Sequence, residues 1–127
     1  MKSTEFRRLN YVTDQFGEVT QIESISETEI FSKEIGEIPI YCVLPIPLTE
    51  DILLKCGFEK KSMGLIIKLN EHTLLQLSIC NDKGKGEYYA MISQDHDIIS
   101  IPRRVFELHE LQNLYRILKG EELTVNL

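Results

Sequence analysis

The chain lacks several features that mark particular protein classes. Its 127 residues include no Trp and only 3 Cys, and no apolar run approaches the roughly 20 residues that a membrane-spanning helix needs. The cysteines, Cys42, Cys56 and Cys80, lie far apart, so their spacing fits neither a disulfide framework nor a zinc site. We expect them to be small apolar residues of a reduced protein.

Basic residues are also few. The sequence has 14 Lys and Arg against 20 Asp and Glu, a formal net charge of -6. An acidic total opposes nonspecific attraction to nucleic-acid phosphates, although a local basic patch can outweigh the average. The opening "MKSTEFRRLNYV" has no apolar run behind its basic residues, so it does not predict a signal peptide. A cytoplasmic protein that does not enter a membrane is the resulting expectation.

The first third of the chain predicts short strands. "LNYVTD" and "FGEVTQIESI" flank a turn at 14–17, and "TEIFSKE" and "GEIPIYCVL" follow. Pro39 indicates an edge strand or a break, because proline donates no hydrogen bond to a neighbouring strand. Four short strands with tight corners can curl into a small barrel.

A short helix is predicted in "PIPLTEDILLKCGFEKK". Thr49 is a good N-cap, and Glu50 and Asp51 place negative charge where the helix dipole favours it. Gly57 can adopt the left-handed conformation that ends a helix. These start and stop signals predict a helix of about two turns.

Four further strands are predicted in the second half, at "GLIIKLN", "TLLQLSIC", "GEYYAMISQ" and "DIISIP". Short loops between them predict an antiparallel meander. The expected fold is therefore α+β, with a β-rich half at 1–46 and an α-β-β-β-β-α half at 47–127. We expect the two halves to form one compact unit.

An amphipathic helix is predicted near the end of the sequence, at about 106–119, and Gly120 ends it. Its apolar half is expected to pack on the sheet through Leu111, Leu114, Tyr115 and Leu118.

The other half of this helix carries the candidate site residues His109, Gln112, Asn113 and Arg116, spaced i, i+3, i+4 and i+7. We predict that this row is the solvent side of the helix. It could instead be a contact surface for a partner, because solvated helix faces favour Glu and Lys over such residues. A third interpretation is that some of these side chains cap loops or strand ends of the first half.

Other motifs that resemble reactive sites have simpler interpretations. "NDKGKGEYY" lacks the spacing of a phosphate-binding loop and precedes a strand, so it predicts a hairpin loop. Asp95, His96 and Asp97 are metal-ligand types, but neighbouring strand residues point to opposite sides, so a polar turn is favoured. His72 has the same interpretation. The sequence shows no catalytic constellation, so we expect neither an enzyme nor a bound cofactor or metal.

The basic residues most able to form a patch are Lys60, Lys61, Lys83, Lys85, Arg103 and Arg104. If they cluster, phosphate contact becomes feasible. Scattered, solvated side chains are the favoured interpretation.

The two helical segments carry a resemblance. "PIPLTEDILLKCGFEK" and "HELQNLYRILKGEELTV" resemble the signatures of a family of small uncharacterised proteins, common in Bacteroides-type bacteria and in their prophages and conjugative elements. The family's usual end, His-x-Leu-Gln-Asn-Leu-Tyr and then Leu-x-Gly-Glu-Glu-Leu, matches His109, Leu111, Gln112, Asn113, Leu114, Tyr115, Leu118, Gly120, Glu121, Glu122 and Leu123.

The family's opening, Gly-Asn-aromatic-Val followed by a Gly-x-Val turn, matches Asn10, Tyr11, Val12, Gly17 and Val19. Leu9 replaces the first glycine, and Arg116 stands where the family often has an aromatic residue. The resemblance spans most of the chain but is loose in the meander. It implies an SH3-like barrel at 1–46 and a mobile-element context, and it brings no known activity.

Two functions follow as expectations. The first is a non-enzymatic interaction module that binds a protein partner or another copy of itself. The alternative is a nucleic-acid-associated accessory protein of a phage or conjugative element, which the acidic total disfavours.

Overall fold

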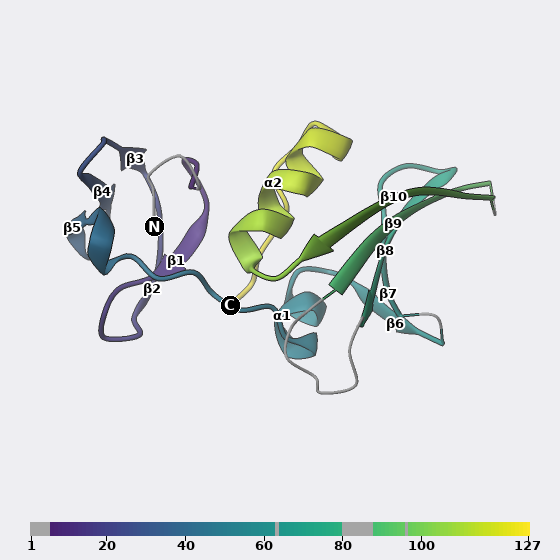
Figure 1. The fold of residues 1–127 in the computed structure, drawn as a ribbon, viewed down its shortest axis with the longest axis horizontal. Helices are drawn as coiled ribbons and strands as arrows, with labels where there is room; N and C mark the ends of the chain where they lie inside the picture. Colours follow the sequence, from purple (N-terminus) through teal and green to yellow (C-terminus); the bar gives the residue numbers. More distant parts are fainter. Residues whose placement is uncertain (1–5, 63, 80–87, 96) are drawn as a thin grey trace. The chain divides into compact units, whose positions relative to one another are not determined.

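The computed structural model describes residues 6–62, 64–79, 88–95 and 97–127, apart from the side chains of 79 and 98–103. The chain divides into two units. Unit 1 comprises Met1–Ile46 and Glu107–Asn113, and unit 2 comprises Pro47–Phe106 and Leu114–Leu127. Figure 1 labels their elements.

Unit 1 contains two small antiparallel sheets. Strands β1 (Tyr11–Thr13) and β2 (Val19–Gln21) form one, and β3 (Ser24–Ile25), β4 (Glu29–Ser32) and β5 (Gly36–Pro39) form the other in the order β3-β4-β5. The 3-10 helix η2 (Ile40–Cys42) follows. Neither sheet closes on itself among the described residues, so the expected SH3-like barrel is not confirmed. Closure needs each strand to pair on both sides, and these strands are very short.

The core of unit 1 comes from residues that alternate with exposed neighbours along the strands. Within β4, Ile30 is buried and Phe31 is exposed, as a strand with one covered face requires. Pro39 ends the edge strand β5, which confirms its predicted position. One cluster of buried apolar residues consists of Phe6, Val12, Ile22, Ile30, Ile38 and Val43.

A tight turn joins β1 to β2, at the predicted place. The Oδ1 atom of Asp14 accepts hydrogen bonds from the backbone N–H groups of Phe16 and Glu18, each at 2.9 Å. Gly17 has a φ of 82°, which suits glycine because it has no Cβ. The side chain of Asp14 therefore fixes this turn from within.

Leu9 has an uncommon backbone conformation. Its φ is 75°, in the left-handed region. Gly adopts this region freely and Asn and Asp tolerate it, but other residues such as leucine are strained there. Its N–H donates to the Ile22 carbonyl at 2.8 Å, and its own carbonyl accepts from the Gln21 side chain at 3.0 Å. These bonds hold a leucine in a conformation that glycine adopts easily.

In unit 2 the short helix α1 spans Glu50–Lys55, with Thr49 as its N-cap. The Thr49 hydroxyl accepts a hydrogen bond from the Ile52 N–H at 3.2 Å. Gly57 has a φ of 93°, and the N–H of Phe58 donates to the Leu53 carbonyl at 3.1 Å. The predicted helix and both of its end signals are confirmed.

The sheet of unit 2 is a five-stranded antiparallel meander in the order β10-β9-β8-β7-β6, visible in Figure 1. This confirms the predicted meander and adds β6 at its edge. Leu75 and Leu77 on β8 are fully buried, while Leu74 and Ser78 on the opposite face are partly exposed. The strands are β6 (Glu59–Lys61), β7 (Gly64–Lys68), β8 (Thr73–Ile79), β9 (Tyr88–Gln94) and β10 (Asp97–Val105).

The final helix, α2, spans Leu108–Lys119 and is amphipathic as predicted, although it begins at Leu108 rather than Phe106. Its residues are divided between the units after Asn113. Leu111 is fully buried and belongs to unit 1, whereas Tyr115 is buried and belongs to unit 2. The sequence predicts instead that the whole apolar face of this helix packs on one sheet. No helix of the described residues is both long and apolar enough to cross a membrane.

Candidate functional site

The row predicted on the last helix does not form its solvent side. His109 is 3% exposed and Gln112 is 1% exposed, so the prediction is wrong for both. Asn113 is half-buried, and Arg116 is exposed as predicted. The helical periodicity separated apolar from polar residues correctly. It could not show that polar side chains here bond to the backbone and side chains of unit 1.

Gln112 bonds to the segment that leads into β1. Its Oε1 accepts from the Tyr11 N–H at 2.8 Å, and its Nε2 donates to the Leu9 carbonyl at 3.0 Å. One side-chain amide thus pairs a backbone donor and a backbone acceptor, as a neighbouring strand would. This is the third role considered for the row, the capping of strand ends.

Asn113 continues this polar network. Its Oδ1 accepts from Arg7 Nε at 2.8 Å and from Asn10 Nδ2 at 2.9 Å. Asn10 is fully buried, and its own Oδ1 accepts from the Arg7 N–H at 2.7 Å. Because buried amides are costly when unpaired, these bonds fix the geometry of the segment before β1.

The remaining two residues of the row lie apart from this network. The His109 ring packs against the Phe6 ring, with centroids 4.7 Å apart. In unit 2, Arg116 Nε lies 3.3 Å from a carboxylate oxygen of Glu122. Gln112 and Asn113 therefore contact one network at the segment before β1, whereas His109 contacts Phe6 and Arg116 contacts Glu122.

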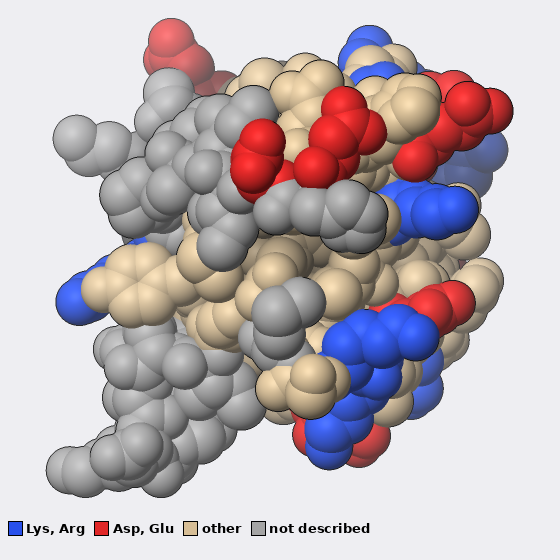
Figure 2. All heavy atoms as spheres, turned by 90° about the vertical axis from the view of Figure 1, so that its right-hand side faces the viewer, with Lys and Arg blue, Asp and Glu red and all other residues tan. Residues whose placement is uncertain are grey.

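The predicted basic residues are partly neutralised where they are described. Lys60 pairs with Glu50 at 2.8 Å and Lys61 with Glu59 at 3.5 Å. The Arg104 guanidinium lies 5.3 Å from the centre of the Tyr89 ring. Figure 2 shows basic and acidic side chains next to one another on one face. Lys83, Lys85 and the Arg103 side chain lie outside the described part.

The described residues of the "QDHD" segment fit the predicted turn. Gln94 on β9 faces Asp97 on β10, and Asp95 between them has a φ of 49°, as a two-residue hairpin turn requires. Asp95 Oδ1 also lies 2.9 Å from His72 Nδ1, beside a surface cavity of about 260 Å³. Both side chains are exposed, and His96 lies outside the described residues. The described residues contain no group of three metal-ligating side chains.

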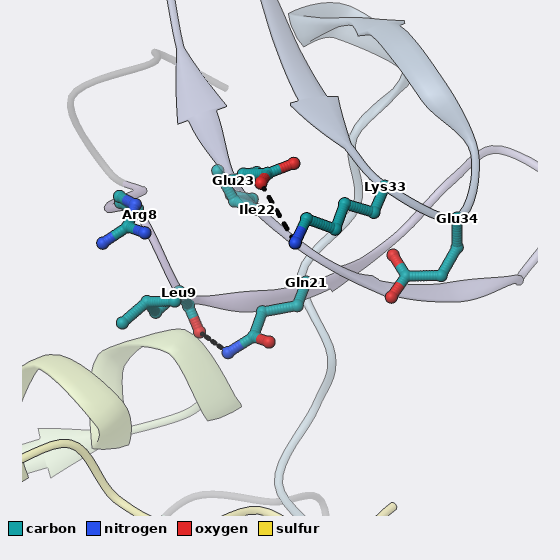
Figure 3. Close-up of a pocket in the computed structure, with 7 residues that line it drawn as sticks. All are labelled: Arg8, Leu9, Gln21, Ile22, Glu23, Lys33 and Glu34. Carbon is teal, nitrogen blue, oxygen red and sulfur yellow. Dashed lines mark hydrogen bonds and ion pairs between the residues drawn. The ribbon is translucent and has the colours of Figure 1, made fainter.

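Another surface cavity, of about 140 Å³, lies in unit 1 and is shown in Figure 3. Both charge signs line it. Lys33 pairs with Glu23 at 3.6 Å, and Glu34 Oε2 accepts from the Thr20 hydroxyl at 2.7 Å. That hydrogen bond lowers the pKa of Glu34. The lining holds two basic residues, Arg8 and Lys33, and two acidic ones, Glu23 and Glu34, so its formal charges balance.

Two of the three cysteines, Cys42 and Cys56, lie among the described residues, and both are free thiols. Burial raises the pKa of the Cys56 thiol to about 11, so the thiolate, which is the nucleophile, is scarce at neutral pH. Cys42 is half-buried, and its Sγ lies 3.4 Å from Gln15 Oε1. Cys80 lies outside the described residues.

Unit 1 has a group of exposed apolar residues that the sequence pattern did not indicate. Phe16 is 83% exposed and Tyr41 is 80% exposed, and Val19 and Leu44 are also exposed. We call these four residues the apolar surface. Their exposure gave no sequence signal, because alternating apolar residues in short strands predicted only core positions.

Backbone pairing brings two residues of the apolar surface, Val19 and Leu44, close to each other. Thr13 pairs with Val19 on one side and with Leu44 on the other. Directly paired residues point to the same face of a sheet, so Val19 and Leu44 flank Thr13 on one face. The contact between Gln15 and Cys42 places the neighbours of Phe16 and Tyr41 against each other.

Comparison of the chain with models of protein families, with curated proteins and with solved structures gave no match.

Proposed function

We propose that the chain is a non-enzymatic interaction module that binds a protein partner through the apolar surface of unit 1. The observation that carries this proposal is the exposure of Phe16 and Tyr41 at the same end of the unit. Single exposed apolar residues are common, but a group of four that includes two aromatic rings is typical of a recognition surface. Aromatic residues are also the ones that contribute most to binding at protein interfaces.

The frame beneath the apolar surface supports this role. Asp14 accepts two backbone hydrogen bonds within the turn that carries Phe16, and Thr13 exchanges backbone hydrogen bonds with Leu44 at 2.9 and 2.8 Å. A surface held by such bonds loses little conformational entropy when a partner binds. The resemblance of the two helical segments adds a mobile-element context to the proposal.

The test compares partner recovery by two variants of the full chain. Phe16→Ser combined with Tyr41→Ser removes both rings from the apolar surface. Ile117→Ser is the matched control, because Ile117 is 75% exposed and lies in unit 2. Tagged proteins are purified from lysates of the source cells, and self-association is measured by light scattering during size-exclusion chromatography.

We expect a partner or a second copy to be recovered with the natural chain and with the control, and to be lost with the double variant. Folding of each variant is checked by circular dichroism. Equal recovery with all three chains would contradict the proposal, as would a natural chain that stays monomeric and unbound.

A further inference from the structure

The acidic charge of the chain is unevenly distributed. When the charged residues of the sequence are assigned to the two units, unit 2 has equal numbers of basic and acidic residues. The whole formal net charge of -6 therefore belongs to unit 1. A partner that docks on unit 1 meets a negative potential, which attracts cationic segments and repels anionic ones.

One face of the β3-β4-β5 sheet combines this charge with an aromatic ring. Phe31 on β4 is 41% exposed and pairs with Ser24 on β3 and with Glu37 on β5. Glu29 lies two residues before Phe31 on the same strand, so the two side chains point to the same side of the sheet. Glu29 pairs with Pro39 on β5. We call Ser24, Glu29, Phe31, Glu37 and Pro39 the β4 face.

The carboxylates of the β4 face have no basic partner among the described residues. Lys33, which follows β4, pairs with Glu23 instead. Glu29 and Glu37 therefore flank Phe31 as exposed or half-exposed negative charges. A Lys or Arg side chain can lay its apolar stem on an aromatic ring and bring its charge to a neighbouring carboxylate.

The β4 face adjoins the apolar surface along the chain. Strand β5 ends at Pro39, a member of the β4 face, and Tyr41 lies in η2 directly after it.

We propose that the docking segment of the partner is a basic, extended polypeptide, whose Lys or Arg side chains pair with Glu29 and Glu37 while an apolar side chain covers Phe31. This rests on the proposed function and adds the chemistry of the partner. The alternating arrangement of Glu29 and Phe31 matches a segment with basic and apolar residues at every second position, because these share one face of an extended chain.

The experiment uses a synthetic peptide with Lys-Ser-Leu-Ser repeats, which places Lys and Leu on one face. A second peptide has Gln in place of Lys, and a third has Glu. Each is titrated into the full chain by isothermal calorimetry at low and at moderate salt. We expect saturable binding of the Lys peptide that weakens with salt, and at least tenfold weaker binding of the other two.

Variants locate the binding. Glu29→Gln with Glu37→Gln is expected to weaken binding of the Lys peptide about tenfold, and Phe31→Ala about fivefold. The control, Glu71→Gln with Glu121→Gln, removes the same charge from exposed positions of unit 2 and is expected to change affinity less than twofold.

Three results would overturn the inference: no binding of the Lys peptide, equal binding of the Gln peptide, or an equal loss in the control variant. Each of these results bears only on the chemistry of the partner, and the proposed function is tested separately by the loss of Phe16 and Tyr41. If loss of Phe16 and Tyr41 abolishes partner recovery but the Lys peptide does not bind, the interaction surface stands and the basic chemistry of the partner is wrong. If the Lys peptide binds at the β4 face but partner recovery is unchanged, the apolar surface is not the binding site.

Discussion

The side chain of Gln112 donates a hydrogen bond of 3.0 Å to the carbonyl oxygen of Leu9, a residue at a φ of 75°. The same amide accepts from the Tyr11 N–H at 2.8 Å. The last helix thereby supplies the hydrogen bonds that the segment before β1 does not obtain from another strand. A strained leucine and a buried glutamine are thus parts of one arrangement.

Replacement of Gln112 by Ala is expected to lower the free energy of unfolding by about 1–3 kcal/mol, because it removes the acceptor of the partly buried Tyr11 N–H and one of the two side-chain donors to the Leu9 carbonyl. Urea denaturation followed by circular dichroism measures this change. Gln94→Ala is the control, because Gln94 is exposed on β9, and we expect a change within about 0.5 kcal/mol. If the two variants lose equally little, the amide of Gln112 has no structural role.

Leu9 provides a test of backbone strain. Leu9→Gly is expected to leave the free energy of unfolding nearly unchanged, because relief of the left-handed strain offsets the lost side chain and the greater freedom of the unfolded chain. Leu9→Val is expected to destabilise by about 1–2 kcal/mol more than Leu9→Gly, since a β-branched residue is least compatible with a positive φ. The same urea titration measures both. A valine variant as stable as the glycine variant would show that position 9 is not strained.

Much of the fold was predictable because its signals are local. The cap at Thr49, the stop at Gly57 and the alternation in β8 depend on residues within one or two turns of each other, and the structure confirms them. The expected SH3-like barrel is not confirmed, because closure depends on pairing between strands that are distant in the sequence. The residues of β2 and β3 contain no signal that decides which neighbours they join.

The candidate site was less predictable, for a related reason. The periodicity of α2 shows two faces, but a face of Gln and Asn can contact water or buried backbone equally well. What decides between them is the position of the Leu9 carbonyl and the Tyr11 N–H, which bond to Gln112 although Leu9 is 103 residues away from it in the sequence. The exposure of Phe16 and Tyr41 likewise depends on what the rest of the chain leaves uncovered.

Two glycines with positive φ differ in the space around them. A Cβ added at Gly64 would lie 2.5 Å from the Leu77 carbonyl oxygen, whereas a Cβ at Gly17 would meet nothing within 4 Å. Gly64→Ala is therefore expected to destabilise by roughly 3 kcal/mol or more, and Gly17→Ala by about 1–2 kcal/mol from backbone strain alone. Thermal and urea unfolding measure both. Equal losses would show that the close pairing of β7 and β8 at Gly64 is incorrect.

The buried thiol of Cys56 predicts a dependence of stability on pH. Burial raises its pKa from 9.0 to about 11 in the folded chain. The thiol therefore contributes stability that is fully present below pH 9.0 and is lost as pH rises through about 11. The expected loss is roughly 2–3 kcal/mol, at about 1.4 kcal/mol for each pKa unit.

Cys56→Ala serves as the comparison, because Tyr88 and Tyr115 also have raised pKa values from burial and lose stability at high pH in both chains. The difference in unfolding free energy between the natural chain and Cys56→Ala should therefore shrink between pH 8 and pH 11. A difference that stays constant over this range would mean that the thiol is not buried in the folded chain.

Site-specific photocrosslinking tests the proposed interaction surface most directly. A photoreactive benzoyl-phenylalanine is placed at position 16 or 41 of the full chain, or at position 117 as an equally apolar and exposed control in unit 2. The chains are irradiated in source cells, and adducts are detected by electrophoresis and mass spectrometry. We predict one shared adduct from positions 16 and 41 that is absent from position 117. No adduct from either position in unit 1, or the same adduct from all three, would contradict the account.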